Sequence, residues 1–153
     1  MGYSVAGEKL EIRTEVEIEA SPADVWKALM AVEAYPRWNP FIAAVDGELR
    51  EGGRIRVLLT PPEGRDVRFS PRIVVLDAER ELRWIGVLGM RALFCTEHFF
   101  RLQALSASRT RLVHGQNVSG LFTRYLGAAI ARTARGCVGM NQALKRYVEH
   151  YAE

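Results

Sequence analysis

The residues of this chain best suited to chemistry are two histidines, His98 and His114, in neighbouring runs of strand-forming residues. Both runs alternate apolar and polar residues, so residues of one parity share a face. Arg101 and Gln103 of the first run belong in solvent beside a turn, which places His98 on the inward face. A neutral histidine can remove a proton, orient a ligand or bind a metal ion.

The same argument turns His114 inward, because Arg109 and Arg111 occupy the other face of its run. Three interpretations are open: two satisfied core histidines, a polar spot that orients a ligand oxygen in an apolar pocket, or a metal site. A metal site needs a third protein ligand, and no acid or cysteine is expected inward nearby. We therefore expect no metal, no cofactor and no assigned catalytic residue.

Other residues expected to face inward, or to line a cavity, are apolar, aromatic or amide side chains of the predicted strands and helix. With the histidines, the predicted ligand-binding set is Trp38, Phe41, Trp84, Phe94, His98, Phe100, His114, Gln116 and Met140. Core packing is the alternative explanation for the tryptophans and phenylalanines, since buried aromatic rings stabilise most cores.

These residues must be positioned by an antiparallel sheet. Residues 11–19 alternate strictly between apolar and charged side chains, which predicts a strand with one solvated face. Short connections rich in turn-forming residues favour hairpins between the strands. Further strands are expected at 41–49, 54–60, 67–77, 82–87, 94–104 and 110–118.

Two short helices are expected after the first strand. Ser21 can cap a helix that begins with Pro22, and Asp24 suits its positive end. A second short helix around 32–35 is expected to stop before Pro36, because proline disfavours the helical conformation in the preceding residue. Residues 35–41 are then expected to form an aromatic corner without regular structure.

A long helix is expected from about Leu121 to Tyr151, capped by Ser119. Its apolar residues recur at spacings of three and four, so they form one continuous stripe. No second long helix can receive this stripe, so the helix must lie on the sheet. A curved sheet around a single helix leaves a cavity, whose mouth is expected at residues 61–65 and 86–91.

Length and composition fit one domain over residues 1–153, with a core from about 10 to 150. The net charge of +3 comes from arginines scattered among acids, which argues against a nucleic-acid partner. We expect no stable membrane insertion, because no apolar run is long enough, and no secretory signal, because residues 1–10 lack an apolar core. Cys95 and Cys137 are expected to be buried and reduced, which fits a cytoplasmic protein. We expect the protein to be a monomer or a homodimer.

Two stretches resemble one known family. The run Ser21-Pro22-Ala23-Asp24-Val25-Trp26, followed by Tyr35-Pro36-Arg37-Trp38-Asn39-Pro40-Phe41, resembles the signature of bacterial START-like proteins of the polyketide cyclase/dehydrase type. Residues 97–102 and 110–114 resemble the final hairpin of that family. The resemblance implies the α+β helix-grip fold of the START/Bet v 1-like (SRPBCC) superfamily. In that fold a curved seven-stranded antiparallel sheet wraps around a long C-terminal helix, and two short helices follow the first strand.

The resemblance also implies a hydrophobic cavity, and it leaves three functions to weigh. The leading hypothesis is binding of an apolar small molecule such as a lipid, an isoprenoid or a polyketide. The alternatives are a cyclase or dehydratase, and a co-chaperone-like module that uses the basic side of the long helix. Similar sequences often carry an acid where this chain has Gln116 and an aromatic residue where it has Val118. A glutamine cannot act as a general base, which favours binding over catalysis.

Overall fold

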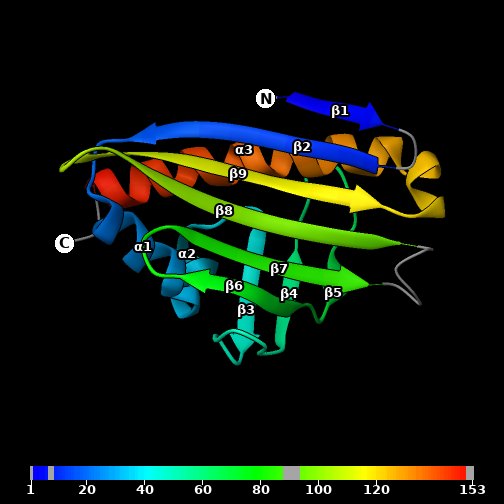
Figure 1. The fold of residues 1–153 in the computed structure, drawn as a ribbon, viewed down its shortest axis with the longest axis horizontal. Helices are drawn as coiled ribbons and strands as arrows, with labels where there is room; N and C mark the ends of the chain where they lie inside the picture. Colours follow the sequence, from blue (N-terminus) through cyan, green and yellow to red (C-terminus); the bar gives the residue numbers. More distant parts are fainter. Residues whose placement is uncertain (1, 7–8, 88–93, 151–153) are drawn as a thin grey trace.

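A six-stranded antiparallel sheet, in the order β1-β2-β9-β8-β7-β6, forms the larger layer of the fold (Figure 1). The computed structural model describes residues 2–6, 9–87 and 94–150. The strands of this sheet are β1 (Gly2–Ala6), β2 (Lys9–Ile18), β6 (Arg72–Asp77), β7 (Glu81–Val87), β8 (Cys95–Ser106) and β9 (Arg109–Ser119). The alternation in β2 is confirmed, since its residues are alternately buried and exposed over most of its length.

A smaller sheet contains β3 (Ile42–Gly47), β4 (Ile55–Leu59) and β5 (Val67–Phe69). Its strands run across the direction of the larger sheet (Figure 1). Backbone hydrogen bonds join the two sheets, from Ile55 N to the Pro71 carbonyl at 3.1 Å and from Ile73 N to the Gly53 carbonyl at 2.9 Å.

The helix-grip architecture is confirmed, but the number and grouping of the strands differ from the expected single sheet of seven. The expected strand over residues 67–77 is two strands in different sheets, β5 and β6. They are separated by Ser70 and Pro71, and a proline has no N–H to donate to a continuous ladder. Strand β1 was not expected from the sequence.

The helices after β2 are α1 (Pro22–Met30), the 3₁₀ turn η1 (Val32–Ala34) and α2 (Tyr35–Trp38). The predicted cap of α1 is confirmed, because the Ser21 Oγ accepts a hydrogen bond from Asp24 N at 3.1 Å. The turn η1 ends before Pro36, but the expectation that residues 35–41 lack regular structure is wrong for 35–38, and Tyr35 is helical although it precedes the proline. Pro36 lies in the first turn of α2, where no N–H is needed, so it begins a new helical turn instead of ending one.

The C-terminal segment contains the 3₁₀ helix η2 (Leu121–Tyr125) followed by α3 (Gly127–His150). The expected unbroken helix from Leu121 to Tyr151, capped by Ser119, is therefore wrong at its start. Gly120, with a φ of 108°, stands at the N-cap of η2, and no side chain caps this turn. Residue 151 lies outside the described residues.

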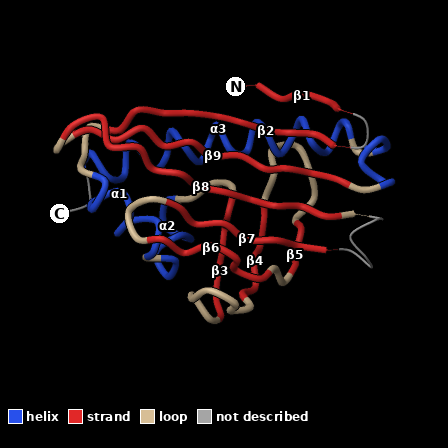
Figure 2. The backbone as a smooth tube through the Cα atoms, in the orientation of Figure 1, coloured by secondary structure: helices blue, strands red, loops and turns tan. Residues whose placement is uncertain are grey.

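Helix α3 runs along the inner side of β2 and β9 and so closes the core (Figure 2). Gly136 sits where this helix comes closest to the rest of the core. A Cβ atom at this position would lie 2.3 Å from Cδ1 of Phe41, so only glycine allows the observed approach. None of the described helices is both long enough and apolar enough to cross a membrane.

Candidate functional site

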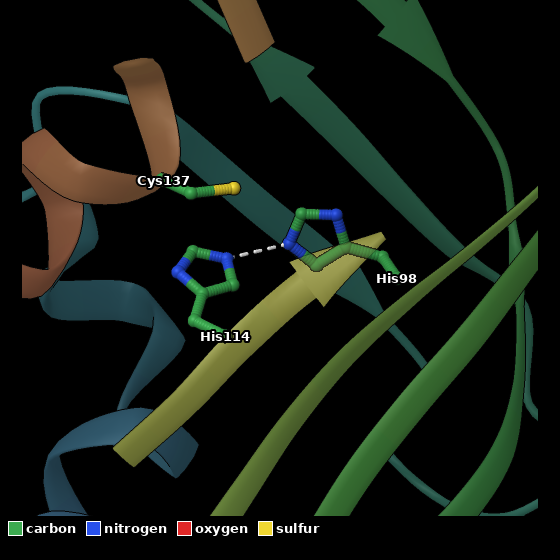
Figure 3. A group of neighbouring side chains, drawn as sticks. All are labelled: His98, His114 and Cys137. Carbon is green, nitrogen blue, oxygen red and sulfur yellow. Dashed lines mark hydrogen bonds between the residues drawn. The ribbon is translucent and has the colours of Figure 1, made fainter. Parts of the chain in front are cut away.

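The two histidines predicted to face inward meet in the centre of the core. His98 of β8 and His114 of β9 are 3% and 0% exposed, and their Nε2 atoms are 2.7 Å apart (Figure 3). The antiparallel register places Gln116 directly opposite His98 and Phe100 directly opposite His114. The pair is therefore a diagonal contact between neighbouring strands, and the period-two alternation positions it.

A chain of hydrogen bonds fixes where the protons of this pair lie. The Thr14 hydroxyl donates to the His114 carbonyl at 2.6 Å and accepts from Asn141 Nδ2 at 2.8 Å. The Asn141 Oδ1 must then accept, and it lies 2.8 Å from His114 Nδ1. His114 therefore carries its proton on Nδ1, and its bare Nε2 accepts from His98 Nε2. This leaves Nδ1 of His98 without a proton.

Burial keeps both rings neutral. Desolvation lowers the pKa of His98 well below 6.5, and the neighbouring His114 lowers it further. Desolvation lowers the pKa of His114 to about 4, although hydrogen bonds to Asn141 and to the Cys137 backbone oppose this shift. A charged imidazole in this apolar core would lose its hydration without gaining a counter-ion. The pair therefore offers neutral nitrogen lone pairs at neutral pH.

Aromatic rings enclose the two imidazoles. Trp84 stacks on His98 with ring centroids 5.2 Å apart, and Phe100 stacks on His114 at 4.3 Å. Phe41 approaches His98 at 6.5 Å. The structure thus brings five of the nine predicted ligand-binding residues into one packed cluster. Stacking holds each ring in a single orientation.

Cys137 of α3 joins the histidine pair. Its Sγ and one ring nitrogen from each of His98 and His114 all lie within 4.8 Å of one another, and all three residues are buried. Figure 3 shows the thiol pointing from the helix toward the rings. Burial raises the pKa of this thiol to about 12, so it is protonated while nothing binds it. The expectation that no cysteine faces inward near the histidines is therefore wrong.

Sequence reasoning missed Cys137 because a strand pattern cannot say which turn of a distant helix lies above a given strand residue. The available signal was the apolar stripe of the helix, on which Cys137 lies beside Met140. A helix can slide along a sheet and still bury the same stripe. Its position is fixed by the contact between Gly136 and Phe41 and by the hydrogen bonds of Asn141 to His114 and Thr14.

A separate cavity of about 80 Å³ lies between the sheet and the first turns of α3. Its lining is mostly apolar and comes from β2, β9, η2–α3 and the segment before β8: Ile12, Phe94, Gln116, Val118, Leu126, Ala129, Ile130 and Thr133. Two predicted ligand-binding residues, Phe94 and Gln116, lie here. The Gln116 Oε1 is buried and meets no donor at hydrogen-bonding geometry among the described residues, although the Gln116 side chain lies close enough to His98 to oppose the lowering of its pKa.

Neither of the last two predicted ligand-binding residues lines this cavity. Trp38 stacks on Tyr147 with centroids 5.3 Å apart and lines a shallow hollow on the surface with Arg37 and Arg146. Met140 is fully buried on α3. The structure therefore distributes the nine predicted residues over a dry cluster, a small cavity, a surface hollow and the core beneath α3.

The predicted mouth of the cavity is partly visible. Glu63, in the β4–β5 connection, forms an ion pair with Arg135 of α3 at 3.5 Å, so this connection does reach the helix. Residues 88–91 of the other predicted loop lie outside the described residues. Part of the basic helix face is already paired, because Lys145 Nζ lies 2.6 Å from Glu149 and donates to the Glu17 carbonyl.

Together, the curved sheets and the helix laid inside them define a helix-grip protein. Residues 9–149 match the family model described as polyketide cyclase / dehydrase and lipid transport, and the chain belongs to this family. The sequence has no significant match among curated proteins.

Several solved structures share the fold. An aromatase/cyclase, ZhuI from Streptomyces sp. R1128, superposes with a TM-score of 0.74 at 19% identity, covering 92% of this chain and 94% of that one. Norcoclaurine synthase from Thalictrum flavum, solved with a transition-state analogue, gives 0.73 at 14% identity, covering 97% and 99%. TTHA0849 from Thermus thermophilus gives 0.73 at 19% identity, covering 94% and 99%. At these identities the likeness concerns the fold.

Proposed function

We propose that this protein binds a small apolar molecule that carries a hydrogen-bond donor, in the cavity beside Gln116. The observation that carries this proposal is the unpaired, buried Gln116 Oε1 in an otherwise mostly apolar lining. A buried acceptor without a partner destabilises a protein by about 1–3 kcal/mol, and a ligand hydroxyl would remove that cost. Apolar burial would supply the rest of the affinity, at about 25 cal/mol per Å². A hydroxylated lipid, isoprenoid or polyketide fits this description.

Binding must enlarge the cavity. Its volume of about 80 Å³ is well below the roughly 300 Å³ of a small ligand pocket. The start of α3 is the part that can move at low cost. Leu121 and Phe122 of η2 are 47% and 44% exposed, and the ion pair from Glu63 to Arg135 lies in solvent, where such pairs contribute little. We therefore propose that η2 and the first turns of α3 move outward as the ligand enters.

Native mass spectrometry of freshly purified protein is the first test. A discrete mass above the 17.2 kDa chain, released by organic solvent and identified as a hydroxylated apolar compound, would support the proposal. A protein that stays free of ligand, also after incubation with a lipid extract, would contradict it.

Two matched probes test the role of Gln116. We expect wild-type protein to bind 1-naphthol about tenfold more tightly than naphthalene, which corresponds to about one hydrogen bond, or 1.4 kcal/mol. Gln116→Leu should abolish this preference. If Gln116→Leu kept the same preference for 1-naphthol over naphthalene as the wild type, the probe would bind away from Gln116.

Two matched alanines test the cavity. Ala129→Leu projects into the lining and should weaken binding of both probes at least tenfold. Ala128→Leu makes the same change on the exposed side of the same turn and should leave binding unchanged. Equal effects of the two variants would exclude this cavity.

A cyclase or dehydratase is the second candidate, favoured by the unprotonated Nδ1 of neutral His98. Such a nitrogen could take a proton from a carbon next to a ketone carbonyl. His98→Gln separates the candidates. An enzyme would lose kcat on a confirmed substrate, whereas a carrier would change only in affinity. The two buried free cysteines fit a reducing cytoplasm for either function.

A further inference from the structure

We propose that His98, His114 and Cys137 form a binding site for one copper(I) ion. Among the described residues, these three offer potential metal-ligand atoms that are close enough to bind one ion. The atoms, one from each residue, lie within 4.8 Å of one another. Two imidazoles and one thiolate are the donor set that favours copper in a trigonal arrangement. The site is distinct from the ligand cavity, whose lining includes none of the three residues.

The geometry requires only small movements. Metal–nitrogen bonds are about 2.0 Å long and metal–sulfur bonds about 2.3 Å, so two nitrogens on a trigonal ion lie about 3.5 Å apart. The Nε2 atoms of His98 and His114 are 2.7 Å apart while they share a proton. The rings must therefore separate by less than about 1 Å, which sliding over Trp84 and Phe100 allows.

The surroundings of each ring already suit an ion between them. His114 gives its Nδ1 proton to Asn141 and so directs its Nε2 lone pair toward the site, as metal-binding histidines do. His98 carries its proton on Nε2, which leaves Nδ1 as the ring nitrogen available to Gln116. Gln116 lies opposite His98 and opposes the lowering of its pKa, yet its Oε1 meets no donor at hydrogen-bonding geometry.

Metal binding would resolve this mismatch. With copper on Nε2, the proton of His98 moves to Nδ1, where it can be donated to the Gln116 Oε1. Both histidines would then have a neighbour that fixes their metal-bound tautomer. The Gln116 carbonyl oxygen has two lone pairs, so it can also accept from a ligand in the cavity.

Charge balance selects copper(I) over zinc(II). When the Cys137 thiol releases its proton to solvent, the thiolate and a singly charged copper ion together are neutral. A doubly charged zinc ion would leave one uncompensated positive charge in a core where both histidines already resist protonation. Structural zinc also prefers four protein ligands, and this group supplies three.

Anaerobic titration of the reduced, full-length protein with copper(I), against a chromophoric copper(I) chelator, tests the proposal. We expect one ion per chain, a rise in the melting temperature, and a copper–sulfur shell in X-ray absorption. Zinc(II) should bind at least a hundredfold more weakly. Because the site is buried, the titration should be repeated on protein refolded with the metal.

Cysteine variants provide the matched control, since Cys95 is also buried and free but lies outside the group. Cys137→Ala should lose the high-affinity copper, while Cys95→Ala should keep it. Gln116→Leu should weaken binding about 10–100-fold, as expected for a residue that orients a metal ligand. Each variant should show a cooperative thermal transition without metal, which separates lost binding from lost folding.

The proposal would be overturned by absence of stoichiometric copper in the refolded wild-type protein. Equal copper binding by wild type and Cys137→Ala would overturn it too, as would an absorption spectrum with only nitrogen or oxygen neighbours. These outcomes would not bear on the proposed ligand binding, because the test with 1-naphthol and naphthalene needs no metal.

Discussion

The two halves of helix α3 meet the sheet in different ways. From Gly136 onward, in what we call the closed half, Cys137, Met140 and Leu144 are completely buried, and Gly136 lets Phe41 approach the helix backbone. Before Gly136, in what we call the loose half, Ala129 and Thr133 are only partly buried and line a cavity. One helix thus has a tightly packed end and a loosely packed end.

Polar groups show this contrast only in part, because the Trp84 Nε1 beside His98 is also buried without a partner among the described residues. In the closed half, Thr14, His114 and Asn141 satisfy one another in a loop of hydrogen bonds. In the loose half, the Gln116 Oε1 has no partner. Buried polar groups are normally paired, so an exception beside a cavity indicates binding, whereas a satisfied network indicates a fixed structure. Under the proposed function, this difference would separate the ligand cavity from the hydrogen-bonded packing around His114.

Truncation of a core ring should give the largest difference in stability between the closed and the loose part of the interface. Phe100→Ala removes a ring that is 0% exposed and stacks on His114, so the free energy of unfolding should fall by about 3–5 kcal/mol. Phe122→Ala, in the exposed η2, should change it by less than about 0.5 kcal/mol. Denaturant unfolding measures both, and similar losses would mean that the two halves are packed alike.

Acid should destabilise the protein through the two histidines of the closed half. The folded-state pKa of His114 is about 4, below the 6.5 of an exposed histidine, so between these values the unfolded chain binds the extra proton. Stability is therefore fully present above pH 6.5 and is lost as the pH falls toward 4. The loss is about 3 kcal/mol from His114, and His98 adds to it.

Urea unfolding at several pH values measures this loss. His114→Asn should flatten the dependence, while His150→Asn, which changes the histidine outside the pair, should keep it. An unchanged slope in His114→Asn would show that other groups cause the acid sensitivity.

Removal of one member of the hydrogen-bonded loop should have an intermediate effect. Asn141→Ala leaves the Thr14 hydroxyl and His114 Nδ1 without their partner, which should cost about 1–3 kcal/mol. The His114 tautomer should then lose its preference, which ¹⁵N chemical shifts report. Asn117→Ala, on the other face of β9, should leave the tautomer unchanged. A His114 ring protonated on Nε2 in wild-type protein would refute the proton assignment.

Substitutions of two glycines in α3 should give the smallest changes in stability, and these changes should have opposite signs. Gly136→Ala forces a Cβ against the Phe41 ring and should destabilise the protein by about 1–3 kcal/mol. Gly139→Ala, three residues further along α3, meets only Pro40 at 4.0 Å and should stabilise it by about 0.5–1 kcal/mol. Thermal melts give both signs, and a stabilising Gly136→Ala would mean that the helix is free to shift.

Much of the fold could be predicted because it follows local rules. The cap at Ser21 and the alternation of β2 are properties of neighbouring residues, and both are confirmed. The break at Pro71 and the new helical turn at Pro36 were missed. Proline has no N–H to donate. Its effect on the structure therefore depends on whether the fold requires a hydrogen bond from that position.

The candidate site was predictable only in part. Alternation and hairpin pairing placed His98 and His114 on the same face of adjacent strands, and the structure brings their rings together. The same pattern assigned Gln116 to that face, but it could not say that its oxygen lacks a partner. Phe94 was grouped with the histidines, yet it lines the cavity, whose lining includes neither histidine.

The sequence by itself determined the elements, the inward faces of the strands and the apolar stripe of the helix, because each depends on a backbone period of 2.0 or 3.6 residues. Tertiary structure alone decided where along the sheet α3 lies, and therefore that Cys137 meets the histidines while Gln116 borders a cavity. The reason is that many alignments of a helix on a sheet bury the same apolar stripe. Side-chain contacts, above all that between Phe41 and Gly136, select one of them.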